Sequence, residues 1–248
     1  QNNSGTWTKI GDDIDGEASN DYSGSSVSIS DDGSIVAIGA YGNDDNGTSS
    51  GHVRIYQNNS GTWTKIGDDI DGEAASDEFG KSVSLSGDGS VVAIGAPNND
   101  NAVDGVEYGE RSGHVRIYKN VSGTWTQMLN YNAYGGDIFG ENKYDASGTS
   151  VSLSDDGSIV AIGAPYNDGG IGWDTYSNSN NKGHVRVYQF SESTTRSSPG
   201  AIAGNWSQIG SDIEGGYRDY SGSSISLSGD GSYLAINGRV GTSGTYIK

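Results

Sequence analysis

Three histidines stand in a repeated His-Val-Arg segment, each two residues before an arginine. The histidines are His52, His114 and His184, and the arginines are Arg54, Arg116 and Arg186. Imidazoles can hold a metal ion or act as general bases. Because each copy belongs to a separate repeat, we expect the histidines to be spread over the molecule and to have a structural role. We expect each arginine to pair with an acid, with the series Asp21, Asp77 and Asp219 as partners.

Acidic residues gather in the segment Asp12–Glu17, which reads DDIDGE and recurs at Asp68–Glu73. Calcium takes roughly six to eight oxygen ligands from carboxylates and carbonyls. A calcium ion is therefore the possible cofactor. Its candidate ligands are Asp13, Asp15, Glu17, Asp69, Asp71 and Glu73. A fourth copy, SDIEGG at 211–216, has fewer acids, and the third repeat is expected to lack the pattern. The alternative is an acidic turn that binds no metal.

Other polar and aromatic residues suggest ligand loops and modification sites. Asn-Asp loops follow the segments that end in Gly-Ala, at 43–45, 98–100 and 167–168, where ordinary turn formation is the favoured explanation. Aromatic side chains of long connections could stack on a sugar: Tyr131, Tyr134, Trp173 and Tyr176. The glycosylation candidates are Asn2, Asn46, Asn58 and Asn120.

Composition and missing motif contexts disfavour several classes of partner and activity. The chain has 32 acidic and 14 basic residues and a net charge of -18, which disfavours nucleic acid and anionic membranes as partners. No apolar run approaches the roughly 18 residues of a membrane span. Motifs such as HExxH, GxSxG and a P-loop do not occur in a credible catalytic context, so we expect no enzyme. The chain opens inside a repeat without a signal peptide, as in a mature or excised product.

Three segments recur along the 248 residues and define four repeats. One contains a tryptophan, as in GTWTKI at 5–10. Another reads SVSISDDGSIVAIGA at 26–40, and a third reads GHVRIY at 51–56. SVSIS alternates apolar and polar residues, as a half-buried strand does, whereas SIVAIGA is a continuous apolar run typical of a strand covered on both faces. The Asp-Gly pair between these two strands predicts a type I′ hairpin turn.

Four strands per repeat predict an all-β fold, a β-propeller of four four-stranded antiparallel blades. We expect a single domain over residues 1–248, with repeat cores at about 26–66, 82–128, 150–209 and 224–248 plus 6–10. Gly244–Lys248 aligns with Gly51–Ile55, so the last repeat lacks its outer strand, and Thr6–Ile10 is a spare outer strand. This strand can close the ring of its own chain or pair with a neighbouring chain.

The second repeat resembles the FG-GAP repeat of integrin α-subunit propellers, in its short-hairpin variety. It contains Phe79–Gly80 and Gly95–Ala96–Pro97, and Phe139–Gly140 with 163–165 matches in part. The first and fourth repeats have Tyr-Ser-Gly at 22–24 and 220–222 instead. The resemblance implies a β-propeller, an extracellular location and a role in adhesion. The integrin calcium loop is not carried over, because its DxDxDG ligands are missing.

Two functions follow as hypotheses. The first is a non-enzymatic extracellular structural or adhesion propeller that self-associates, with fibres formed by strand donation as one form. The alternative is a monomeric lectin-like propeller that binds an extracellular glycan or protein through its long loops.

Overall fold

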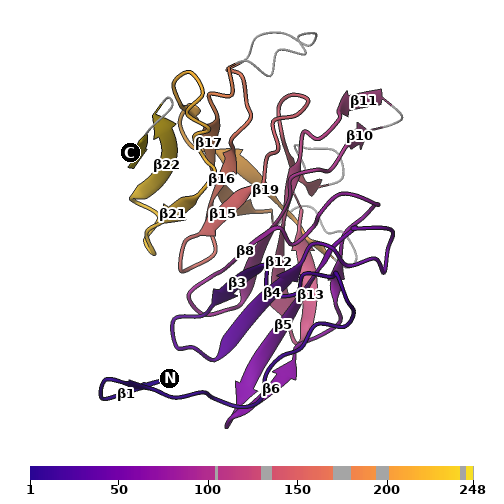
Figure 1. The fold of residues 1–248 in the computed structure, drawn as a ribbon, viewed down its shortest axis with the longest axis vertical. Helices are drawn as coiled ribbons and strands as arrows, with labels where there is room; N and C mark the ends of the chain where they lie inside the picture. The colour runs from indigo at the N-terminus through magenta and orange to yellow at the C-terminus, as the bar shows by residue number, and fades with distance from the viewer. Residues whose placement is uncertain (104–105, 130–135, 170–179, 194–200, 241–243, 248) are drawn as a thin grey trace.

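The computed structural model describes all residues except 104–105, 130–135, 170–179, 194–200, 241–243 and 248. Its described residues form β-strands, turns and coil, and none lies in an α-helix (Figure 1). Within this part of the chain there is accordingly no helix long and apolar enough to cross a membrane. The predicted all-β fold is confirmed.

The strands fall into four repeat sheets, one for each sequence repeat. Repeat sheet 1 contains β3 (Ser26–Ile29), β4 (Ile35–Ala40), β5 (His52–Asn59), β6 (Thr62–Lys65) and β7 (Ile70–Asp71). Repeat sheet 2 contains β8 (Ser82–Leu85), β9 (Val91–Ala96), β12 (His114–Val121), β13 (Thr124–Met128), β14 (Ile138–Phe139) and β18 (Ala201–Ile202). Repeat sheet 3 contains β15 (Ser150–Leu153), β16 (Ile159–Ala164), β17 (His184–Glu192), β19 (Gly204–Gln208) and β20 (Ile213–Glu214). Repeat sheet 4 contains β21 (Ile225–Leu227), β22 (Leu234–Val240) and β23 (Gly244–Ile247). Two hairpins stand apart: β1 (Asn2–Asn3) with β2 (Thr6–Trp7), and β10 (Asn101–Val103) with β11 (Val106–Gly109).

The first three repeat sheets share one antiparallel topology, to which repeat sheet 2 adds β18 parallel to β13. In repeat sheet 1, β3 pairs with β4, β4 with β5, and β5 with an outer strand in two pieces. The piece β6 pairs with the far half of β5, and β7 pairs with its first two residues, His52 and Val53. The pieces β13 and β14, and β19 and β20, repeat this arrangement. The second piece of the outer strand therefore places an acidic segment beside the histidine at the start of the third strand.

The turn between the first two strands differs from the predicted type I′ turn. Gly33 has φ +73°, as expected, but Asp31 and Asp32 are not in the positive-φ region that a type I′ turn requires. Instead Gly33 N donates to Ser30 O, and the Asp32 carboxylate accepts from Ser30 Oγ and Ser34 N. The carboxylate thus closes a longer loop, and the Ser-x-Asp-Gly-Ser spacing serves this arrangement in all four repeats.

The core lies on the second and third strands. Every residue of β9 is buried, and β16 is buried from Val160 onward, as predicted for a strand covered on both faces. Phe79 has no exposed surface and joins the cluster of Val53, Ile55 and Ile94. Burial of this kind contributes about 1.5–3 kcal/mol for each large apolar side chain. The apolar run of each repeat is therefore what holds it to its neighbours.

Successive repeats meet through their first strands, and each contact, here called a junction, uses the same hydrogen bonds. Strand β3 contacts β8, β8 contacts β15, and β15 contacts β21. At the first junction Ser26 Oγ donates to Gly80 O at 2.7 Å, and Leu85 N donates to Ser28 Oγ at 2.9 Å. The equivalent bonds recur at the second and third junctions. The serines that alternate with apolar residues in SVSIS are therefore junction residues.

The junctions also explain the glycines of the FG-GAP-like pattern. A Cβ on Gly95 would run into the Gly148 carbonyl oxygen, and Gly39 is covered by Gly80 in the same way. The structure corrects the match of Phe139–Gly140. Gly148, not Gly140, is equivalent to Gly80, because Gly148 N donates to Gly163 O as Gly80 N does to Gly95 O. Phe139 lies instead in β14, the second piece of an outer strand.

The N-terminal strand does not close the last repeat in this structure. Trp7 of β2 pairs with Asn2 of β1, whereas β23 pairs with β22. Figure 1 shows the N-terminal hairpin at the lower end of the molecule and β23 near the upper end. Trp7 remains 79% exposed. Ring closure within the chain, predicted through Thr6–Ile10, is thus not seen among the described residues.

Candidate functional site

The His-Val-Arg segments place one buried histidine at the start of each third strand. His52, His114 and His184 are at most 1% exposed. Side chains two residues apart in a strand point to the same face. Each histidine therefore shares its face with the following arginine, and the three histidines lie in three repeat sheets, as predicted.

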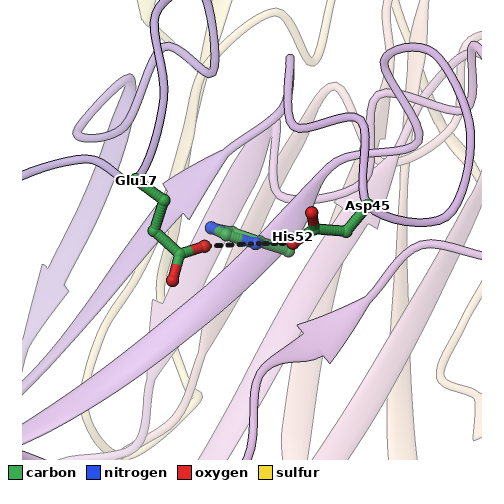
Figure 2. A group of neighbouring side chains, drawn as sticks. All are labelled: Glu17, Asp45 and His52. Carbon is green, nitrogen blue, oxygen red and sulfur yellow. Dashed lines mark ion pairs between the residues drawn. The ribbon is translucent and has the colours of Figure 1, made fainter.

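His52 faces two carboxylates, as Figure 2 shows. Its Nδ1 lies 3.9 Å from Glu17 Oε2 and 4.0 Å from Asp45 Oδ2. This Nδ1 is buried and has no hydrogen-bond partner among the described residues. Glu17 comes from the coil before β3, and Asp45 from the loop after β4. Both carboxylates are partly exposed, at 42% and 64% of the side chain, so the group opens to solvent on their side.

The other two histidines face similar acids. His114 Nδ1 lies 3.7 Å from Asp137 Oδ2, with Glu73 in the same group. His184 Nδ1 lies 3.8 Å from Glu141 Oε2 and 3.7 Å from Asp212 Oδ2. Burial lowers the pKa of His114, and burial together with Arg186 lowers the pKa of His184 to about 4. These two imidazoles are therefore neutral at neutral pH.

The third repeat does carry a copy of the acidic segment, contrary to the prediction. Ile138 pairs with Val115 as Ile70 pairs with Val53, so GDIFGE at 136–141 is equivalent to DDIDGE at 68–73. Asp137 and Glu141 are therefore site residues that the sequence reasoning missed. The signal was present in the shared pattern Asp-Ile-x-Gly-Glu.

Each arginine pairs with an acid, but not with the predicted series. Arg54 Nη1 lies 3.3 Å from Glu17 Oε1, and Arg186 Nη1 lies 3.6 Å from Glu141 Oε1. Arg116 contacts Glu73 and binds Asp137 through two hydrogen bonds of 2.8 and 2.9 Å. In the first three acidic segments, a glutamate side chain reaches from the end of the segment to the next third strand. The length of the glutamate side chain explains why the arginines pair with these glutamates and not with the predicted aspartates.

The aspartates predicted as arginine partners instead hold the Asn-Asp loops. Asp77 Oδ2 accepts from Asn99 Nδ2 at 2.8 Å, and the carboxylate of Asp21 accepts from Asn43 in the same way. In the third repeat Asp145 accepts from Asn167. Burial raises the pKa of Asp77, and it raises the pKa of Asp145 to about 6. Asp219, the fourth-repeat member, accepts from the backbone N–H of Gly216. The loops after Gly-Ala are accordingly built by buried Asp–Asn pairs.

The calcium candidates are divided between different partners. Asp13 pairs with Lys9 and Asp69 with Lys65. Glu17 and Glu73 lie against His52 and His114 instead, in two different groups. Asp15 and Asp71 complete the set, and Asp71 lies beside His52 in the β5–β7 pairing. The six carboxylates thus do not form one ligand set, and calcium binding stays a prediction.

The remaining predicted site residues divide into two sets. The sugar-stacking candidates Tyr131, Tyr134, Trp173 and Tyr176 lie outside the described residues. The sequon asparagines Asn2, Asn58 and Asn120 each accept a backbone hydrogen bond within a hairpin, which gives their recurrence a structural reason. Asn46 donates through its side-chain nitrogen to Gly72 O at 2.7 Å. Glycosylation of these four residues stays a prediction.

The family model of the FG-GAP repeat matches residues 14–56 and 70–118. These two segments are similar to FG-GAP repeats. They include the ends of the acidic segments, from residues 14 and 70 onward, and the Gly-Ala strands and His-Val-Arg strands of the first two repeats. No match to a curated protein is found.

Solved structures that are similar to this chain have low sequence identity to it. A candidate 6-phosphogluconolactonase from Bacteroides uniformis ATCC 8492 is 12% identical, with a TM-score of 0.47, over 90% of this chain and 52% of its own. The hydrazine synthase of Kuenenia stuttgartiensis is 15% identical, with a TM-score of 0.46, over 85% and 48%. The tricorn protease is 12% identical, with a TM-score of 0.45, over 88% and 19%. The chain spans about half the length of the first two.

Proposed function

We propose that this chain is a non-enzymatic structural and adhesion module of the cell exterior, which associates end to end with a second copy of itself. The FG-GAP repeats support the location, because such repeats occur in extracellular and surface proteins. The observation that carries the association is a pair of complementary faces on the first and fourth repeats.

The face of β3 turned away from the second repeat is apolar and exposed. Val27 is 64% exposed and Ile29 is 59% exposed, whereas the equivalent Val151 and Leu153 are 8% and 6% exposed. Leu85, the counterpart of Ile29 in the second repeat, is 7% exposed. A preceding repeat covers each of these buried positions. The first repeat therefore presents the half of a junction that a further repeat would cover.

The fourth repeat presents the other half. Ser224 and Ser226 are equivalent to Ser26 and Ser28, are exposed, and have no side-chain partner among the described residues. If the fourth repeat of one copy docks on β3 of another, Ser224 Oγ can donate to Gly24 O, and Ser226 Oγ can accept from Ile29 N. The same two bonds hold every junction within the chain. Such a head-to-tail contact builds filaments unless its rotation closes a ring.

Light scattering after size exclusion tests the proposal. The wild type should form multiples of the single-chain mass as concentration rises, and the double variant Val27→Asp, Ile29→Asp should remain single. Its own folding should change little, since both side chains are exposed. Val121→Asp is the matched control, because Val121 is 49% exposed on an outer hairpin away from the junctions. A wild type that stays single at high concentration would exclude the proposal.

A second variant separates face packing from strand donation. Deletion of residues 1–10 removes the exposed Trp7 and its strand but leaves Val27 and Ile29 in place. If donation of Thr6–Ile10 holds the copies together, this deletion alone should abolish association. If face packing is sufficient, association should survive the deletion and fail only in the aspartate variant.

A further inference from the structure

We propose that Glu17, Asp45 and His52 form a binding site for one divalent metal ion of the zinc class. The site shares Glu17 with the predicted calcium ligands but differs from them in kind, because its central ligand is an imidazole nitrogen. Imidazole suits zinc and related transition metals, whereas calcium takes oxygen ligands alone.

The histidine supplies the first argument. Its side chain is 1% exposed, and its Nδ1 is buried without a hydrogen-bond partner among the described residues. A buried polar atom without a partner costs roughly 1–3 kcal/mol. This nitrogen points at two carboxylates rather than at an apolar wall (Figure 2). A cation between the three groups would satisfy the nitrogen and both carboxylates together.

The distances fit this arrangement with a small contraction. The candidate ligand atoms of Glu17, Asp45 and His52 all lie within 4.8 Å of one another. Ligands about 2.1 Å from a tetrahedral zinc ion lie about 3.4 Å apart. Since Glu17 and Asp45 are 42% and 64% exposed, their side chains can close the remaining gap while the buried imidazole stays fixed. The fourth position would face solvent and take water.

The charges around His52 favour a cation. Glu17, Asp45 and Asp71 lie near the imidazole, and Arg54 is the basic residue paired with this group. Arg54 contacts Oε1 of Glu17 and leaves Oε2 facing the histidine. These carboxylates outnumber the single guanidinium that is paired with them, which leaves an excess of negative charge. One divalent ion would neutralise most of that excess.

The second repeat contains a natural control. His114 also has an unpartnered Nδ1, but Arg116 binds both of its acids, Glu73 and Asp137. A metal ion there would have to displace the guanidinium from both carboxylates. The two groups therefore share a histidine and a glutamate but differ in the charge available to a cation.

Nuclear magnetic resonance of the imidazoles tests the site directly, since the chain has only three histidines. Metal-stripped protein at neutral pH is titrated with Zn²⁺ alone, and with Ca²⁺ as the comparison ion. We expect the His52 signals to shift to saturation at one equivalent of Zn²⁺ and to stay unchanged with Ca²⁺. The His114 signals should not move over the same range.

Variants separate metal binding from a plain ion pair. Asp45→Asn should weaken zinc binding at least tenfold, and His52→Gln should abolish it, while Glu192→Gln, a charge change on the distant end of β17, should leave it unaltered. His114→Gln should also leave it unaltered. Unchanged His52 signals in the presence of Zn²⁺, or binding that persists in a folded His52→Gln variant, would overturn the proposal. The amide spectrum of each variant reports folding.

Discussion

Alanine should destabilise the protein far more at Gly148 than at Gly24, although both glycines have φ +87°. Positive φ costs alanine about 1–2 kcal/mol at either position. A Cβ on Gly148 would lie 2.6 Å from His114 O and 3.1 Å from Gly95 Cα, both across the junction, whereas a Cβ on Gly24 would meet no atom within 4 Å. Overpacking of this kind adds about 1–3 kcal/mol. We therefore expect losses of about 1–2 kcal/mol for Gly24→Ala and about 2–5 kcal/mol for Gly148→Ala.

Urea unfolding followed by tryptophan fluorescence measures this difference. The samples should be dilute, so that no second copy covers Gly24, and equal slopes with denaturant would show that both variants expose the same surface on unfolding. Losses that agree within about 0.5 kcal/mol would refute the reasoning, because strain of the backbone alone would then account for both variants. Such a result would mean that the junction can relax to admit a methyl group.

Three further predictions concern single polar groups. Burial raises the pKa of Asp145 from 3.8 to about 6, so the unfolded chain loses this proton at lower pH than the folded chain. The free energy of unfolding should therefore fall by up to about 3 kcal/mol as pH rises from 4 to 7. Asp145→Asn should remove that loss when unfolding is measured as a function of pH. Hydrogen bonds from Ser228 and the Ser232 backbone lower the pKa of Asp230 to about 2. The stabilisation from these bonds is present above about pH 4 and is lost as pH falls toward 2. The stability of Asp230→Asn should not show this loss at acid pH, and an acid unfolding curve like that of the wild type would contradict the prediction. Ser84→Ala should cost about 1–3 kcal/mol, because it leaves Leu153 N without its acceptor, whereas Ser226→Ala should cost less than about 0.5 kcal/mol in the single chain and weaken only self-association.

The sequence was sufficient to predict the strands because each repeat carries its own periodicity. The alternation of SVSIS and the continuous run SIVAIGA both correspond to observed strands, with the expected burial in β9 and β16. The turn type was predicted wrongly, since the Asp32 carboxylate forms hydrogen bonds that make a longer loop favourable. A two-residue motif such as Asp-Gly does not report the side-chain bonds around it.

The site was harder to predict because its members come from segments that are far apart in the sequence. Glu17 meets His52 only when the coil before β3 lies against β5, and nothing local to either segment specifies that contact. The assignment of Phe139 failed for a related reason. Equivalent positions are set by hydrogen-bond register, and the Phe-Gly letters recur in β14 by coincidence with a different register. A search for the spaced pattern Asp-Ile-x-Gly-Glu could have found Asp137 and Glu141.

The hairpin loops of the four repeats are joined by a directional series of peptide hydrogen bonds. Asp31 N donates to Gly87 O, Gly87 N to Asp155 O, and Asp155 N to Gly229 O. Each bond points the same way, so the peptide dipoles add as they do along a helix. The series ends with a free carbonyl at Asp31 and a free N–H at Gly229 among the described residues. An assembly that continued this series would be electrically polar along its length.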